Sequence, residues 1–194
     1  MDLKPILEEV YAKCCAAQSD INEHLPVLKE YASKCEHVTE FGVRDCVSTW
    51  AFLAGFPKKF ICYDIIESPQ VENAKKLAES CGIDFSFHKK NVTEIAIEPT
   101  DLLFIDTFHC YGQLKSELAL HANKVKKYLI FHDTSTFGYR DEDYFADHLN
   151  KFTGEFAKCT GLMPAIDEFL AGNPSWKVTR VFHNNNGLTV LEKS

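Results

Sequence analysis

Hydrophobic and polar positions follow two alternating periods along most of the chain. From His37 onward, short apolar runs typical of strands are separated by segments in which apolar residues recur at helical spacing. This alternation indicates an α/β fold with a mainly parallel sheet. The expected strands are His37–Phe41, Lys59–Tyr63, Asp84–His88, Leu102–Ile105 and Tyr128–Phe131. The expected helices between them are Asp45–Ala54, Ser68–Ser80 and Tyr111–Asn123.

The two ends of the chain depart from this pattern. Leu3 to Ser33 has apolar residues at helical spacing with a break near Ser19, which predicts two helices over the edge or mouth of the sheet. At the other end, Trp176–Phe182 and Leu188–Leu191 are strand-like and are joined by an Asn-Gly turn that favours positive φ. We therefore expect a doubly wound, seven-stranded sheet closed by an antiparallel hairpin.

One segment fits neither period. Residues 134–162 are rich in aromatic and acidic side chains, and we interpret them as an insertion, or lid, over the sheet. A helix over Met163–Leu170 follows, ended by Gly-Asn-Pro. Because no linker-like stretch interrupts the chain, we expect one domain over residues 1–194, with residues 1–36 as a helical cap.

Composition and charge narrow the class of protein. The chain has 194 residues, 45% of them hydrophobic, as in an average globular domain. Its 21 basic and 28 acidic residues give a net charge of −7, which argues against nucleic acid as a partner. Without a secretory signal or a membrane-length apolar run, and with eight cysteines but no CxxC pair, it is expected to be cytoplasmic and not membrane-bound. The apolar face of the opening helices could build a homodimer if the sheet does not cover it.

Polar residues gather where the predicted strands end. In open α/β sheets ligands bind beyond the carboxyl ends of the strands, so these residues would converge on one crevice. In chain order they are Glu40 with Gly42, Asp64, Asn91, Asp106, and His132 with Asp133.

The first half of this set suits a nucleotide-like ligand. Gly42 would let the backbone approach a ligand, and the amides of the following helix would be available to it. Asp64 fits a carboxylate that accepts hydrogen bonds from ribose hydroxyls. A plain strand-to-helix turn at Gly42 and a helix N-cap or solvated acid at Asp64 are the simpler interpretations.

The second half suits a metal ion. If their strands are neighbours, Asp106, His132 and Asp133 can bind one divalent cation, since carboxylates suit Mg or Mn and imidazole admits Mn, Fe or Zn. Two capping aspartates and a hydrogen-bonded core histidine are the alternative. Gly42 is the only glycine of its turn, which disfavours a phosphate loop or a dinucleotide fingerprint.

The whole pattern resembles class I S-adenosylmethionine-dependent methyltransferases. The string from Phe104 to Tyr111, together with His132-Asp133-Thr134, is most similar to the metal-dependent O-methyltransferases related to cephalosporin hydroxylase-like and sugar O-methyltransferases. The resemblance covers about residues 38–192 and implies a Rossmann-like fold, S-adenosylmethionine as cofactor, and Mg or Mn as the divalent metal.

Carried over residue by residue, the resemblance implies a role for each strand end. Glu40 and Gly42 would lie beside the methionine part of the cofactor, Asp64 at its ribose and Asn91 near the adenine. Asp106 would serve the cofactor, the metal and the reaction.

The same resemblance implies ligands and a base. Asp106, His132 and Asp133 match the metal ligands, and His109 stands where such enzymes often carry a catalytic lysine, so it is the candidate general base. The sequence departs from the family at Cys46, where a further glycine is common, and at His132, where a carboxylate is usual.

The resemblance leads to a functional expectation. We expect methyl transfer to a hydroxyl of a small molecule, such as a sugar or natural-product intermediate. The alternatives are a metal-dependent hydrolase or lyase that uses Asp106, His132 and Asp133, and a non-catalytic domain that binds S-adenosylmethionine.

Overall fold

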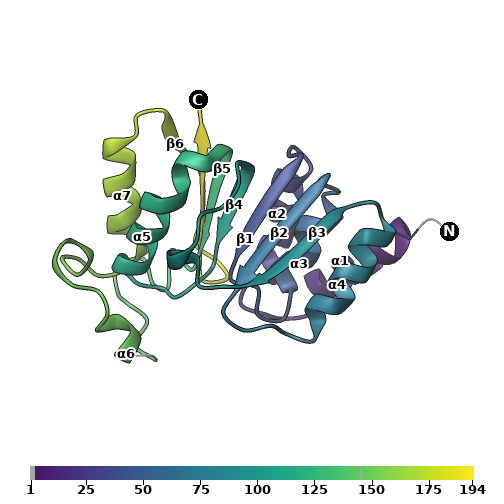
Figure 1. Ribbon diagram of the computed structural model, residues 1–194, viewed down its shortest axis with the longest axis horizontal. Coiled ribbons are helices and arrows are strands. Elements are labelled where there is room, and N and C mark those ends of the chain that lie inside the picture. Colours follow the sequence, from purple (N-terminus) through teal and green to yellow (C-terminus); the bar gives the residue numbers. More distant parts are fainter. Residues whose placement is uncertain (1–2, 145) are drawn as a thin grey trace.

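A seven-stranded sheet forms the centre of the computed structural model, which describes residues 3–144 and 146–194 (Figure 1). The strand order is β3-β2-β1-β4-β5-β7-β6. The first five strands are parallel, and β7 runs antiparallel to both β5 and β6. The strands are β1 (His37–Phe41), β2 (Lys59–Asp64), β3 (Asp84–Lys89), β4 (Thr100–Ile105), β5 (Val125–His132), β6 (Trp176–Phe182) and β7 (Leu188–Lys193). The predicted mainly parallel sheet with a terminal hairpin is confirmed.

Helices cover both faces of the sheet (Figure 1). One face carries α1 (Lys4–Ala16), α2 (Leu25–Ala32), α3 (Val47–Ala54) and α4 (Gln70–Ser80). The other carries α5 (Tyr111–His121) and α7 (Leu162–Gly172). The remaining helical segments are α6 (Ala146–Leu149) and the 3-10 turns η1 (Asn22–His24), η2 (Val92–Glu94), η3 (Ala122–Lys124) and η4 (Gly154–Phe156).

The continuous apolar runs of the central strands have a direct structural cause. Along β4, Leu102 and Phe104 pack into the core beneath α1 to α4, whereas Leu103 and Ile105 pack beneath α5 and α7. Successive strand side chains point to opposite faces, so the stretch 102–105, which is covered on both faces, is apolar at every position.

Element bounds differ from the expected ones mainly at the ends. The fifth strand begins at Val125 rather than Tyr128, because Lys126 and Lys127 interrupt its apolar run although their backbone remains in the sheet. The helix expected to end at Asn123 stops at His121 and continues as η3. Residues 1, 2 and 145 of the predicted cap and insertion lie outside the described residues.

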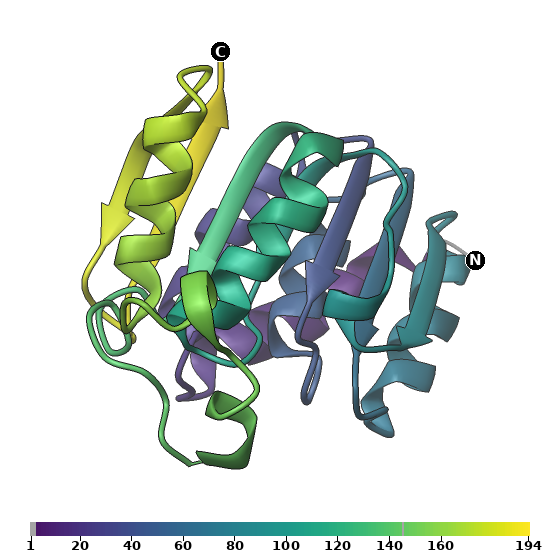
Figure 2. The same cartoon turned by 60° about the vertical axis from the view of Figure 1, so that its left-hand side comes forward.

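The two predicted additions to the sheet take different places. The helices of the cap pack on α3, with η1 reaching the carboxyl edge of the sheet, where His24 Nε2 lies 3.0 Å from the carbonyl oxygen of Asn184 in the β6–β7 turn. The insertion lies at the same edge of the sheet, beside the start of α5 (Figure 2). Both therefore border the mouth of the strand-end crevice. No helix in the described ranges is long and apolar enough to span a membrane.

Close packing between α2 and the end of α3 depends on Gly55. A Cβ atom there would lie 2.5 Å from the Ala32 Cβ and 2.9 Å from the Ser33 amide nitrogen. We predict that Gly55→Ala lowers the free energy of unfolding by about 1–3 kcal/mol. Gly172→Ala is the control, because a Cβ there meets nothing within 4 Å, and it should leave stability unchanged or raise it by up to about 1 kcal/mol. Urea unfolding measures both, and equal effects would contradict the packing argument.

Candidate functional site

The register of the parallel strands places the predicted residues at one edge of the sheet. Glu40 pairs with Phe104, and Ile105 pairs with Phe131, so β1, β4 and β5 end side by side. Asp106 and His132 therefore stand next to each other. The strand order reverses between β1 and β4, which is where open α/β sheets bind ligands.

The loop after β1 is held tightly against the end of β4. Gly42 has φ +84°, and a Cβ atom there would lie 1.9 Å from the Asp106 carbonyl oxygen. Arg44 and Cys46 also have positive φ, 43° and 64°, although neither is glycine. The backbone of the loop is thus left-handed at two residues that are not glycine. Such strained backbone is typical of ligand-binding turns.

Glu40, the penultimate residue of β1, is fully buried. Its carboxylate accepts hydrogen bonds from Ser48 Oγ at 2.5 Å and Thr49 Oγ1 at 2.7 Å, both in the first turn of α3. Burial raises the pKa of Glu40 to about 8. Glu40 thus ties the end of β1 to the first turn of α3.

Asp64 organises the same loop from β2. Its Oδ2 accepts the backbone amides of Val43 at 2.7 Å and Arg44 at 3.1 Å, and its Oδ1 accepts that of Ile66 at 2.9 Å. Oδ2 already accepts two hydrogen bonds, whereas Oδ1 accepts one and has a further lone pair, so Asp64 retains capacity for one ligand hydroxyl.

Asn91 is engaged in a local turn. Its side chain caps η2 by accepting the Thr93 amide at 3.1 Å, and it donates to Glu94 at 2.8 Å. Both hydrogen bonds are made within the segment 91–94, so the amide group of Asn91 is engaged locally rather than with the other strand ends.

Asp106, His109 and Asp133 form a compact cluster whose ligand atoms lie within 4.8 Å of one another. The imidazole Nε2 of His109 is 3.1 Å from Asp106 Oδ1 and 2.9 Å from Asp133 Oδ2. His132 adjoins the cluster, with Nδ1 at 3.4 Å from Asp106 Oδ1 and 3.7 Å from Asp133 Oδ2. The sequence-predicted trio is thus brought together, and His109 joins it.

The donor set fits a divalent cation. Two ligands bound to one cation at about 2.1 Å lie roughly 3–3.4 Å apart, close to most of these separations. Among the described residues, the buried atoms His132 Nδ1 and Asp133 Oδ1 have no hydrogen-bond partner. Buried polar atoms without partners are costly, and a cation or its bound water would satisfy them.

Electrostatics couples the members of the cluster. Burial opposes the charged imidazole of His109, but its three carboxylate partners outweigh burial and raise the pKa of His109 well above its usual value. Burial also opposes the charge on His132, whereas the Asp106 carboxylate raises the pKa of His132. Despite burial, which acts in the opposite direction, these two histidines hold the pKa of Asp106 below its usual value.

The insertion supplies two contacts that the sequence did not indicate. Glu142 Oε2 lies 2.9 Å from His109 Nδ1, and the Phe137 ring stacks on the His109 ring at 4.9 Å. Both residues are distant from His109 in sequence and lie in irregular structure, so no periodicity marks them. The third unexpected neighbour is His24 of the cap, whose ring meets that of His132 edge-on at 5.7 Å. The acidic, aromatic composition of the insertion was the only signal.

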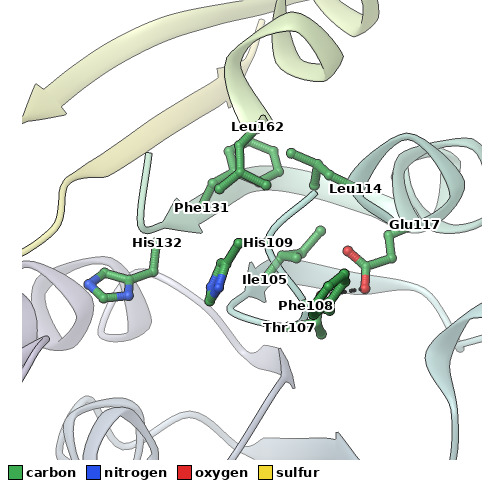
Figure 3. Close-up of a pocket in the computed structure, with 9 residues that line it drawn as sticks. All are labelled: Ile105, Thr107, Phe108, His109, Leu114, Glu117, Phe131, His132 and Leu162. Atoms are coloured by element: carbon green, nitrogen blue, oxygen red, sulfur yellow. Dashed lines mark hydrogen bonds between the residues drawn. The ribbon is translucent and has the colours of Figure 1, made fainter. Parts of the chain in front are cut away.

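A small cavity of about 10 Å³ lies behind the cluster, on the side of α5 (Figure 3). Its lining includes His109, His132 and the carboxyl group of Glu117, which accepts hydrogen bonds from Thr107 Oγ1 at 2.6 Å and Gln113 Nε2 at 2.7 Å. Burial raises the pKa of Glu117 to about 7. The other lining residues are Ile105, Thr107, Phe108, Leu114, Phe131 and Leu162.

The fold is that of O-methyltransferases. An O-methyltransferase from Bacillus cereus in complex with SAH aligns over 99% of this chain and 90% of its own, with a TM-score of 0.59 and 11% identity. TomG, an O-methyltransferase from Streptomyces achromogenes involved in tomaymycin synthesis and bound to SAM, aligns over 92% and 82%, with a TM-score of 0.60 and 12% identity. The SAH-bound methyltransferase PaMTH1 from Podospora anserina aligns over 97% and 87%, with a TM-score of 0.52 and 16% identity.

These likenesses show the Rossmann-like architecture of class I S-adenosylmethionine-dependent O-methyltransferases. No protein-family model matches the sequence, and no curated protein is significantly similar to it.

Gly42 offers a test of the loop geometry. We predict that Gly42→Ala costs more than about 2 kcal/mol of unfolding free energy, because a Cβ atom is both strained at this φ and in collision with the Asp106 backbone. Gly82→Ala has nearly the same φ, +80°, with nothing within 4 Å of the new Cβ, and should cost only about 1 kcal/mol. Chemical denaturation compares the two, and equal losses would refute the close approach of β1 and β4.

Glu117 makes stability depend on pH. Its folded-state pKa of about 7 exceeds its unfolded value, so its contribution is fully present below the unfolded pKa near 4.5 and is lost as pH rises through 7. We predict that Glu117→Gln reduces the fall in unfolding free energy between pH 5 and 8, by up to a few kcal/mol. The exposed Glu67→Gln is the control. A wild-type slope retained in Glu117→Gln would exclude this role.

Proposed function

We propose that the protein is an S-adenosylmethionine-dependent O-methyltransferase, assisted by Mg or Mn, that methylates a hydroxyl group of a small molecule. The observation that carries this proposal is the Asp106, His109 and Asp133 cluster in the ligand-binding crevice of an O-methyltransferase fold, with partnerless buried atoms on Asp133 and the adjoining His132. The solved structures with bound SAM or SAH support the choice of cofactor.

The β1 and β2 ends would bind the cofactor, which supplies an electrophilic methyl group on a positively charged sulfonium. Gly42 allows the loop to lie flat against β4, and Asp64 holds that loop by its amides. Asp64 would bind the ribose through the remaining lone pair of Oδ1, and Glu40 would hold the start of α3 against β1. Asn91 would contact the adenine only after its side chain breaks its hydrogen bonds to Thr93 and Glu94.

The β4 and β5 ends would bind the acceptor. Asp106, Asp133 and the imidazole of His132 would hold the divalent cation, whose chemistry is to lower the pKa of a substrate hydroxyl. His109 would take the hydroxyl proton at Nε2 only in its neutral form, which burial favours but the surrounding carboxylates disfavour by raising its pKa. The carboxylates around it stabilise the imidazolium that this transfer produces.

A cytoplasmic location belongs to the same proposal. All eight cysteines are thiols rather than disulfides in the structure, which suits a reducing compartment.

Asp133 gives the sharpest test of the metal role, because it belongs to the cluster but not to the cofactor loop. We predict that purified protein binds S-adenosylmethionine with micromolar affinity and transfers its labelled methyl group to members of a hydroxylated-acceptor panel, faster with Mg or Mn than with chelator. Asp133→Asn should lower the metal-stimulated rate by roughly 100-fold, with cofactor affinity within about threefold. Asp84 is the first residue of β3 and lies at the edge of the sheet opposite the crevice, so Asp84→Asn should leave the metal-stimulated rate and the cofactor affinity unchanged.

Two results would contradict this function. Absence of cofactor binding by calorimetry would remove the methyltransferase assignment. Methyl transfer that proceeds as fast with chelator as with metal, and as fast in Asp133→Asn as in wild type, would show that the reaction does not need the metal.

A further inference from the structure

The turn between β4 and α5 carries Asp106 and His109 of the cluster and is hydrogen-bonded to a buried acid of α5. Thr107, which directly follows Asp106, donates from Oγ1 to Glu117 Oε1 at 2.6 Å, drawn as a dashed line in Figure 3. Gln113 Nε2 donates to the same oxygen at 2.7 Å. Glu117 lies in the middle of α5 and is fully buried. The turn is thus tied to the following helix by side chains as well as by the chain itself.

Burial of Glu117 is costly, which argues that its hydrogen bonds do more than add general stability. Its second oxygen, Oε2, has no hydrogen-bond partner in the part of the chain that the structure describes. An apolar side chain of similar size would occupy the same space without this penalty. An apolar side chain could not accept a hydrogen bond from Thr107, so holding Thr107 is what distinguishes Glu117 from an ordinary core residue.

The insertion reaches the same turn through Gln113. His148 of α6 lies with Nε2 at 3.2 Å from Gln113 Oε1, so the two ends of the Gln113 amide group connect His148 to Glu117. The His148 ring also meets the Phe108 ring edge-on at 4.6 Å. Successive residues of the turn are therefore held from two sides, one by α5 and the next by the insertion.

We propose that Glu117 is the positioning residue of the β4–α5 turn, and that through Thr107 it fixes the direction in which Asp106 enters the metal site. Outer hydrogen bonds of this kind orient metal ligands and raise metal affinity. The contact does not depend on the protonation of Glu117, because a carboxylate and a neutral carboxyl group both accept a hydrogen bond from a hydroxyl. The effect on metal binding rests on the proposed function, whereas the ordering of the turn does not.

Four variants separate positioning from general stability. Glu117→Met removes the acceptor but keeps a side chain of similar size, and Thr107→Val removes the donor. Glu117→Gln keeps an oxygen that can accept from Thr107. Ser116→Ala is the matched control, because it removes a hydroxyl hydrogen bond to the Gly112 carbonyl oxygen within the same helix. Thermal unfolding shows whether each variant is folded.

Metal affinity is measured by calorimetric titration of the purified protein with Mn²⁺ alone. Glu117→Met and Thr107→Val should each weaken Mn²⁺ binding roughly 10- to 100-fold. The double variant should bind within about twofold of the weaker single variant, because both substitutions remove the same interaction. Glu117→Gln and Ser116→Ala should stay within about threefold of wild type, since the hydrogen bond of Thr107 remains in both.

Amide hydrogen exchange in the metal-free protein reports the order of the turn without metal or turnover. The amides of Asp106 and Cys110 each donate to a backbone carbonyl oxygen, at 2.9 and 3.1 Å. In Glu117→Met and Thr107→Val, both amides should exchange at least about 10-fold faster than in wild type, relative to the amides of β2. Glu117→Gln and Ser116→Ala should exchange at the wild-type rate.

Three results would overturn the inference. They are wild-type exchange of the turn amides in both Glu117→Met and Thr107→Val, wild-type Mn²⁺ affinity in both, and a loss of affinity in Glu117→Gln equal to that in Glu117→Met. If wild-type protein binds no Mn²⁺ but the turn amides respond as expected, the positioning of the turn stands and the metal part of the proposed function fails.

Discussion

Parallel strands that end in register force like charges together, and the rest of the site depends on how that repulsion is relieved. Asp106 and Asp133 directly follow the adjacent strands β4 and β5, and their ligand oxygens lie within 4.8 Å of each other. The imidazoles of His109 and His132 lie between and beside them and lower the pKa of Asp106. Opposite charge within about 4 Å stabilises such a group, and a divalent cation would offer the same compensation with stronger charge.

The other half of the crevice is organised by backbone rather than by charge pairs. Asp64 accepts hydrogen bonds from loop amides, Glu40 ties β1 to α3, and Gly42 lets the loop lie against the Asp106 backbone. The division is physically sensible for the proposed reaction. A rigid, closely approaching backbone suits a large cofactor, whereas an adjustable set of ionisable groups suits proton and metal chemistry.

The sequence predicted what depends on short-range pattern. Apolar runs located all seven strands, and because parallel strands share an edge, Asp106, His132 and Asp133 could be expected to meet. Contacts that depend on the path of irregular segments could not be predicted from the sequence. Glu142 approaches His109 because Asp141 anchors the insertion on α5, and no residue spacing encodes that path. Likewise, the position of Asp64 at the end of β2 was predictable, but the loop amides that it binds were not.

The central claim is that one crevice binds a cofactor at the ends of β1 and β2 and a cation at the ends of β4 and β5. A crystal structure with S-adenosylhomocysteine and Mn²⁺, with anomalous data to locate the manganese, tests it most directly. The account predicts the nucleoside against Asp64 and a manganese peak about 2.2 Å from carboxylate oxygens of both Asp106 and Asp133. A peak remote from these carboxylates, or a ligand bound away from the β1 and β2 ends, would contradict it.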